Sequence, residues 1–277
     1  MKRSSKDMSI ICSVTLALWA GTFAYLDRHD LMDAYRDWQR GPIPEAVSRA
    51  EFDRVFAGVP TVLAEDIRST TISNPEEESV EEVEEPTATE TPQINLAIPF
   101  MVQAPHANWD DLHNEACEEA SAIMLKAYYD GESEITTEEA EERILALADW
   151  EEETFGYHLD TTTEEVARVL REHFGLPRAQ AVTITSIDDI KASIAAGHPV
   201  IVPAYGRALG NPNFRGEGPL YHMLVIKGYT AGKFITNDPG TKRGADFVYD
   251  FDTIWNALHD WNGGDVENGA KMVVMVR

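Results

Sequence analysis

The sequence predicts an α+β domain that begins near Ile94 and runs to the C-terminus. Two observations support this fold class. Between residues 110 and 197, apolar residues recur at helical spacing, and the segments are bounded by capping residues. After residue 199, short runs of β-branched and aromatic residues replace that pattern. Helices followed by a set of strands are typical of a domain in which helices lie beside an antiparallel sheet.

Four helices are predicted in the first half of this domain. The segment NEACEEASAIMLKAYYD places apolar residues from Ala116 to Tyr128 on one helical face. The other three follow capping residues. They are a helix from Thr136 to about Glu153, one after the Asp160–Thr163 cluster that ends before Gly175, and one over about Ser186–Ala196 that stops at Gly197.

Strands dominate the second half. Five apolar runs have the composition and length of strands: PVIVPAY, YHMLVIKGY, KFITND, ADFVYD and KMVVMV. INLAIPFMV, at the start of the domain, is also strand-like, and one more helix is predicted around Asp252–Trp261. We expect the strands to pair in an antiparallel sheet.

The N-terminus predicts a membrane anchor. Residues 1–7 form a basic tail with Lys2, Arg3 and Lys6, and residues 8–26 form a run of 19 without a charge. At 1.5 Å per residue this run matches a hydrocarbon core of ~30 Å. Basic residues on its N-terminal side keep that end cytoplasmic, which exports the rest. The alternative is a cleaved signal peptide and a secreted protein, but the run is long and no clean A-x-A site follows.

Two further segments are predicted before the domain. Residues 27–63 form a juxtamembrane segment with short helices, for example around Pro44–Phe56. Residues 64–93 form an acidic linker, because ten Asp or Glu face one Arg between Ala64 and Thr91, with Ser, Thr and Pro interspersed. Such a composition cannot bury a core and extends by self-repulsion.

Charge and cysteine content exclude some classes of function. The formal net charge is -25, so phosphate backbones would be repelled, and no nucleic-acid partner is expected. Cys12 and Cys117 lie in segments of different character, so no disulfide framework is expected. Ile11 is too bulky to precede a lipid-modified cysteine. No HExxH motif and no grouped ligands occur, so no metal or cofactor is predicted.

Cys117 is the candidate nucleophile. It lies in the first turn of its predicted helix, with Asn114 as a candidate N-cap, where backbone N–H groups and the helix dipole favour a thiolate. Glu118 and Glu119 follow at once and oppose a negative sulfur. The thiol therefore needs a paired base, for which a histidine is the usual choice.

Three further residues complete a candidate site. His222 begins an apolar strand after the loop GNPNFRGEGPLY, which suits a base at the edge of a cleft and equally suits a core histidine. Asp238 ends the next strand, so a hairpin through residues 229–233 would bring it to His222, although Asp-Pro-Gly is also ordinary turn chemistry. Gln103 carries an amide that suits an oxyanion hole.

Cys, His and Asp occur in the order expected of a papain-like thiol hydrolase, with a Gln upstream. The sequence resembles the papain-like peptidase family typified by the bacteriocin-processing, double-glycine leader peptidases, and is most similar to its stand-alone branch in bacterial envelopes. The resemblance covers roughly Ile94–Trp261 and is carried by VQAPHANWDDLHNEACEEAS, PVIVPAYGR, GPLYHMLVIKGY and FITNDPGTKRG.

The resemblance implies the papain-like fold and a role for each candidate. Cys117 matches the nucleophile, His222 the general base and acid, Asp238 the orienting carboxylate, and Gln103 the oxyanion donor. No multi-span region or P-loop accompanies the domain, so the double-glycine leader substrate is not carried over.

Three functions remain open. The main hypothesis is a membrane-anchored cysteine peptidase that acts on peptides or proteins outside the cytoplasm. The same residues would serve a cell-wall peptide amidase or transferase, because fold and triad do not define the acyl donor. A catalytically silent binding module on a spacer is the third. Substrate preference and oligomeric state are not readable from the sequence.

Overall fold

The computed structural model describes residues 40–56 and 93–277. Residues 44–277 belong to one compact unit. The predicted basic tail, anchor and acidic linker lie outside the described residues, as does most of the predicted juxtamembrane segment. Within residues 40–56 and 93–277, no helix has both the length and the apolar character needed to cross a membrane.

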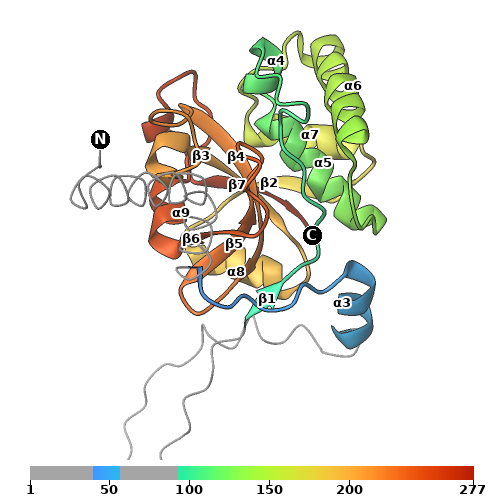
Figure 1. Ribbon diagram of the computed structural model, residues 1–277, viewed down its shortest axis with the longest axis vertical. Helices are drawn as coiled ribbons and strands as arrows, with labels where there is room; N and C mark the ends of the chain where they lie inside the picture. The colour runs from blue at the N-terminus through green and yellow to red at the C-terminus, as the bar shows by residue number, and fades with distance from the viewer. Residues whose placement is uncertain (1–39, 57–92) are drawn as a thin grey trace, which may run out of the picture. The chain divides into compact units, whose positions relative to one another are not determined.

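A seven-stranded sheet is the centre of the described structure (Figure 1). Its order is β2-β7-β3-β4-β5-β6, with β1 paired to β4, and every one of these pairs is antiparallel. The predicted antiparallel sheet is therefore confirmed. Its strands are β1 Ile94–Asn95, β2 Ala179–Thr183, β3 Val200–Tyr205, β4 Tyr221–Tyr229, β5 Lys233–Asn237, β6 Phe247–Asp250 and β7 Met272–Val276.

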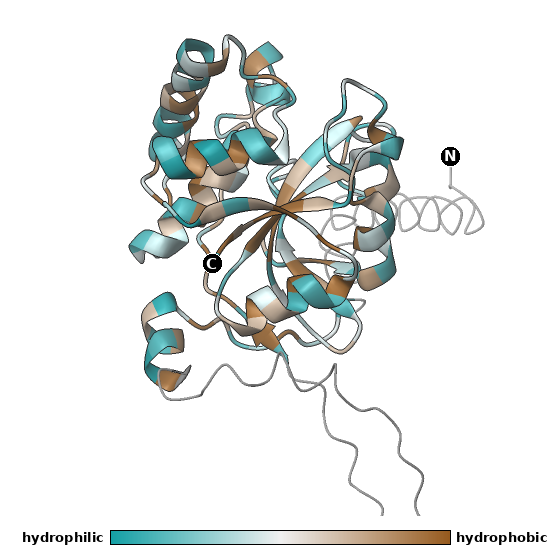
Figure 2. Cartoon of the chain, turned by 180° about the vertical axis from the view of Figure 1, so that it is seen from behind, coloured by the Kyte–Doolittle hydropathy of each residue, from teal (hydrophilic) through white to brown (hydrophobic). Residues whose placement is uncertain are grey.

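Two strands differ from the expectation. β1 contains only two residues, and just beyond it the Ile98 backbone N–H donates to the Leu96 carbonyl at 2.9 Å instead of to another strand. β2 was not predicted, since AQAVT has little of the apolar character of a strand; it forms because each of its five residues pairs with one in β7. The most hydrophobic strands lie together in the middle of the sheet (Figure 2).

Helices α4 to α7 gather on one side of the sheet as a helical half (Figure 1). Capping boxes at Thr136 and Thr162 explain where two of them begin, as the sequence predicts. Helix α5 packs against β4 and carries buried residues on nearly every turn. The helices are α4 Asp111–Asn114, α5 Cys117–Asp130, α6 Thr137–Phe155, α7 Thr163–Glu172, α8 Ile187–Ala195 and α9 Phe251–Ala257.

A segment that precedes the acidic stretch also packs on this unit. Val47 forms a parallel bridge with Leu96, and helix α3 (Arg49–Phe56) follows. Phe52 is buried, and its ring lies against Gly197. Arg49 Nη1 donates to the Gly197 carbonyl at 3.2 Å. The compact unit therefore includes a short segment ahead of the range expected from the sequence.

Candidate active site

Cys117 is the first residue of α5 and lies against β4. The helix does not begin as predicted: its N-cap is Ala116, which makes no side-chain capping bond, and Asn114 instead ends the short helix α4, which Asp110 caps. The break between α4 and α5 still leaves Cys117 at a helix N-terminus. Its backbone N–H has no acceptor within its own helix, and the helix dipole is positive there.

His222 and Asp238 form a buried pair. His222 lies near the start of β4, Asp238 follows β5, and the pairing of β4 with β5 brings the two together. His222 Nε2 and Asp238 Oδ1 are 2.8 Å apart, and both side chains are shielded from solvent. The hairpin contact expected from the sequence is therefore present, and the distance is that of a strong, charge-assisted hydrogen bond.

Four donors hold the Asp238 carboxylate. Tyr249 Oη donates to Oδ2 at 2.6 Å, Asn211 Nδ2 donates to the same oxygen at 3.0 Å, and the Gly240 N–H donates to Oδ1 at 3.0 Å, beside His222. Burial acts to raise the Asp238 pKa, but the charge and hydrogen bond of His222 and the remaining donors outweigh it. The pKa of Asp238 is therefore lower than usual, and the group stays ionised.

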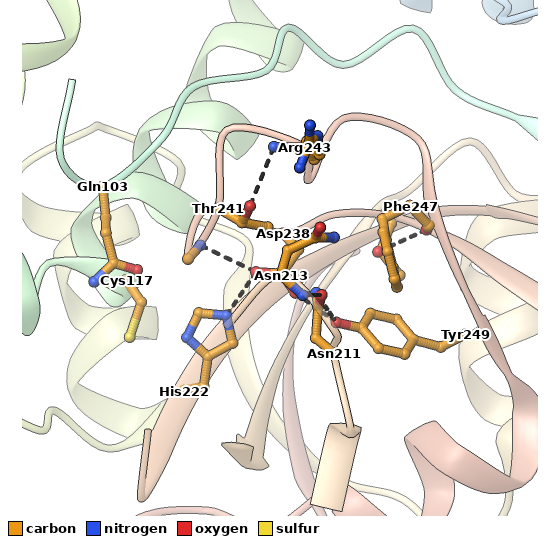
Figure 3. A network of polar contacts seen from close by, with 12 residues as sticks. Gln103, Cys117, Asn211, Asn213, His222, Asp238, Thr241, Arg243, Phe247 and Tyr249 are labelled. Carbon is orange, nitrogen blue, oxygen red and sulfur yellow. Dashed lines mark hydrogen bonds and ion pairs between the residues drawn. The ribbon is translucent and has the colours of Figure 1, made fainter. Parts of the chain in front are cut away.

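The imidazole of His222 is held in one orientation. Phe214 packs edge-on against it, with ring centroids 5.2 Å apart, and Gly240 lies so close that a Cβ there would be 2.9 Å from Cε1. Because Nε2 bonds Asp238, Nδ1 is the free ring nitrogen. Figure 3 shows the Cys117 side chain directed toward that side of the ring.

The Cys117 thiol also contacts Glu118. It donates to Glu118 Oε2 at 2.8 Å. Burial, followed by the negative charge of Glu118, raises the pKa of the thiol well above its usual value, while the Met223 N–H lowers it. The sequence predicts that Glu118 opposes a thiolate, and in the structure its carboxyl group contacts the sulfur directly.

Gln103 lies beside Cys117, but its amide has other partners (Figure 3). Nε2 donates to the carbonyls of His113 at 2.9 Å and Asn114 at 3.0 Å. Both amide hydrogens are therefore used in this state, and an oxyanion role requires the amide to turn. The backbone N–H of Gln103 donates to the Pro239 carbonyl at 3.0 Å, which links the helical half to the Asp238 loop.

Two other histidines have structural partners. His113 is buried between Asp110, which caps α4, and Glu141, while the half-buried His198 bonds Tyr129 Oη at 3.0 Å. Across residues 40–56 and 93–277, no three His, Cys, Asp or Glu side chains are placed to hold a metal ion.

Several residues of the site were not singled out from the sequence. Asn211 lies in the loop between β3 and β4, Tyr249 lies in β6, and nothing in their local sequence marks them as partners of Asp238. Gly240 was read as part of a turn, although its close approach to His222 is what excludes a side chain. The one available signal was the run Asp238–Gly240, in which the glycine directly follows a candidate carboxylate.

A comparison with known protein families identifies the family of this chain. Residues 95–262, more than half of the sequence, match the model described as the Peptidase_C39 like family. The chain therefore belongs to the Peptidase_C39 like family, and family membership supports a peptidase. The finer resemblance to the bacteriocin-processing, membrane-anchored branch stays a prediction.

A solved structure gives a more distant likeness. A Bacillus anthracis protein described as a C39-like peptidase is 18% identical, with a TM-score of 0.46, over 68% of this chain and 98% of its own. A search of the curated proteins found no match.

Proposed function

We propose that this chain is a cysteine peptidase in which Cys117 is the nucleophile, His222 the general base and acid, and Asp238 the orienting carboxylate. The observation that carries the proposal is the 2.8 Å contact between His222 Nε2 and Asp238 Oδ1, with the imidazole turned toward Cys117 (Figure 3). An ionised carboxylate at Nε2 selects the tautomer and stabilises the imidazolium.

The acylation step follows from this geometry. His222 Nδ1 takes the thiol proton, and the sulfur attacks the scissile carbonyl. The developing oxyanion accepts from the Cys117 backbone N–H at the start of α5. Gln103 supplies a second donor when its amide turns away from the His113 and Asn114 carbonyls. The imidazolium then protonates the leaving amine, and a thioester remains on Cys117.

Deacylation reverses the roles. His222 removes a proton from a water molecule, the resulting hydroxide adds to the thioester, and the acid product leaves as the sulfur regains its resting state. Asp238 keeps its charge throughout, because four buried donors stabilise it. The steps use the side chains of Cys117, His222, Asp238 and Gln103, together with the Cys117 backbone N–H and one water molecule.

We further propose that the enzyme acts outside the cytoplasm, tethered by residues 8–26, on peptide or protein substrates. The charge-free run and the basic tail before it support this, as does the acidic stretch that would serve as a spacer. Protease protection of the domain in intact cells, compared with permeabilised cells, tests the orientation; cleavage of the domain only after permeabilisation would overturn it.

The enzymatic proposal is tested with the full-length chain and its Cys117→Ala, His222→Ala and His173→Ala variants. Each is incubated with a mixture of blocked peptides and with purified cell-wall peptide, and new termini are identified by mass spectrometry. His173 is an exposed histidine at the end of α7 and serves as the matched control. Peptide cleavage that is lost in C117A and H222A but retained in H173A is the expected result.

Two other outcomes would overturn it. Cleavage confined to the cell-wall substrate would identify the amidase or transferase alternative. No turnover, together with iodoacetamide labelling of the Cys117 peptide that is unchanged in H222A, would identify a binding module. Labelling is read on the Cys117 peptide because Cys12 is the other cysteine in the chain.

A further inference from the structure

Glu118 touches the atom that would carry out the reaction, and the proposed triad gives it no role. Its Oε2 lies 2.8 Å from Cys117 Sγ, and its Oε1 accepts the Thr161 N–H at 3.1 Å. The side chain is 2% exposed. Because one oxygen is anchored on the loop before α7 and the other on the sulfur, the carboxyl group has a single orientation.

We propose that Glu118 positions the nucleophile and controls its proton: as a neutral acid it donates to Cys117 Sγ and favours the thiolate, and as a carboxylate it retains the thiol. The inference rests on the proposed role of Cys117. It assigns to Glu118 a task distinct from that of His222, which receives a proton from the sulfur and delivers it to the leaving group.

The surroundings of Glu118 favour its neutral form. In the described part of the chain no Lys or Arg is paired with it. The titratable groups that face it are Cys117 and Glu119 on α5, Glu151 on α6, Asp160 in the following loop and Tyr221 on β4. Each of these groups is neutral or negative. Burial, then Glu119, raises the pKa of Glu118 well above its usual value.

The hydrogen-bond pattern suits a carboxylic acid. Oε1 accepts from a backbone N–H, as the carbonyl oxygen of an acid does, while Oε2 is directed at the sulfur. The Met223 backbone also lowers the pKa of the thiol. If Oε2 carries the proton, it donates to the sulfur, which favours the thiolate. If Oε2 is bare, the sulfur must supply the proton and remain a thiol.

The proton count is balanced when Glu118 starts as the neutral acid. The S–H bond of Cys117 breaks and an N–H bond forms on Nδ1 of His222, while the O–H of Glu118 stays on Oε2 and donates to the thiolate. The leaving amine later takes the proton from His222. Raising the pH removes the proton from this site and leaves the carboxylate, which disfavours the thiolate.

The test compares Glu118→Gln, Glu118→Met and Glu119→Gln in the full-length chain. Gln keeps a donor toward the sulfur and removes the charge, whereas Met removes both at similar length. Glu119 is the matched control, because it is a buried acid on the same helix, whereas the sulfur bonds Glu118. The readout is the pH dependence of iodoacetamide alkylation at Cys117, with thermal unfolding to confirm folding.

As the pH rises during the titration, wild-type Glu118 becomes a carboxylate and retains the thiol, whereas Gln cannot ionise. We therefore expect E118Q to move the alkylation midpoint at least about one pH unit below wild type, which is a tenfold change in thiolate at a given pH. E118M should fall between the two. E119Q removes a nearby charge but no contact with the sulfur, so it should shift the midpoint by less than E118Q does. Equal midpoints in E118Q and E118M would overturn the donor role. An E118Q midpoint equal to wild type would overturn control by Glu118.

This measurement needs no substrate, so its failure is separable from failure of the proposed peptidase. The peptidase proposal fails when peptides are not cleaved or when H222A leaves Cys117 unaffected. The Glu118 proposal fails when the alkylation midpoints of wild type, E118M and E118Q do not follow the expected order. If one Glu118 variant does not fold, the other is compared with E119Q and wild type, which still decides whether Glu118 controls the thiol.

Discussion

The Tyr249 hydroxyl donates to Asp238 Oδ2 at 2.6 Å, and so connects strand β6 to the carboxylate that orients His222. The two residues are separated by 11 positions in the sequence. Because Asp238 is fully buried, its charge depends on such donors. The site therefore uses a third strand, in addition to β4, which carries His222, and β5, which Asp238 follows.

Replacing Asp238 with Asn should abolish most activity. An amide cannot stabilise the imidazolium and presents a donor where Nε2–H needs an acceptor, so we expect kcat/KM to fall about 10²- to 10⁴-fold.

Tyr249→Phe removes one of the four donors to Asp238 and should lower kcat/KM about tenfold. It should also raise the Asp238 pKa and move the acidic limb of the kcat/KM profile to higher pH. Equal losses in D238N and Y249F would contradict this order.

Gly240→Ala should disable the site without unfolding the domain. Its Cβ would lie 2.9 Å from both His222 Cε1 and Phe214 Cε1, so the imidazole must shift. A displacement of about 1 Å can cost about 100-fold in rate. Gly232→Ala is the matched control, since a Cβ there meets nothing within 4 Å. Full activity in G240A with an unchanged melting temperature would show that the imidazole does not need this space.

Stability should fall as pH rises from about 4.5 to about 8. Glu119 and Glu151 are buried on facing helices, and as two carboxylates they would leave both Glu119 oxygens without a donor. Burial raises the pKa of Glu151 to about 8, and burial with Glu151 raises that of Glu119. Between the ordinary carboxyl pKa of about 4.5 in the unfolded chain and the raised pKa in the folded state, the folded state holds more protons. This contribution to stability is therefore fully present below pH 4.5 and is lost as the pH rises toward the folded-state pKa.

Urea unfolding at pH 5 and pH 8 measures this effect, and Glu151→Gln is the informative variant. This substitution leaves Glu119 without a second carboxyl group that could ionise beside it, so the urea midpoint of the variant should change less with pH than that of wild type. Glu153→Gln on the exposed face of α6 is the control. A wild-type midpoint that is higher at pH 8 than at pH 5 would contradict the prediction.

The segment before the acidic stretch should contribute to stability. Phe52 is 5% exposed and packs against Gly197, so Phe52→Ala should cost about 3 kcal/mol of unfolding free energy. Val55, on the same helix, is 58% exposed, and its replacement by Ala should change stability by less than about 0.5 kcal/mol. Chemical denaturation of both full-length variants checks this. Equal effects would show that helix α3 does not hold the unit together.

Much of the fold was predictable because its signals are local. The capping residues Thr136, Thr162 and Ser186 mark helix starts that the structure confirms. The long apolar runs of β3, β4 and β7 are buried strands whose composition suits no exposed element. By contrast, β2 has a weak local signal and depends on its pairing with β7. Asn114 was the expected cap, but the chain instead breaks into two helices at Glu115 and Ala116.

By itself the sequence determined the α+β class, the order of Cys117, His222 and Asp238, and the strand pairing that joins the last two. These follow from periodicity and from short hairpin connections, which act over a few residues. Only the tertiary structure decided that Glu118 bonds the nucleophile, that Tyr249 and Asn211 hold Asp238, and that the Gln103 amide is occupied. Such contacts depend on how distant segments meet inside a low-dielectric interior, where burial decides which groups carry charge.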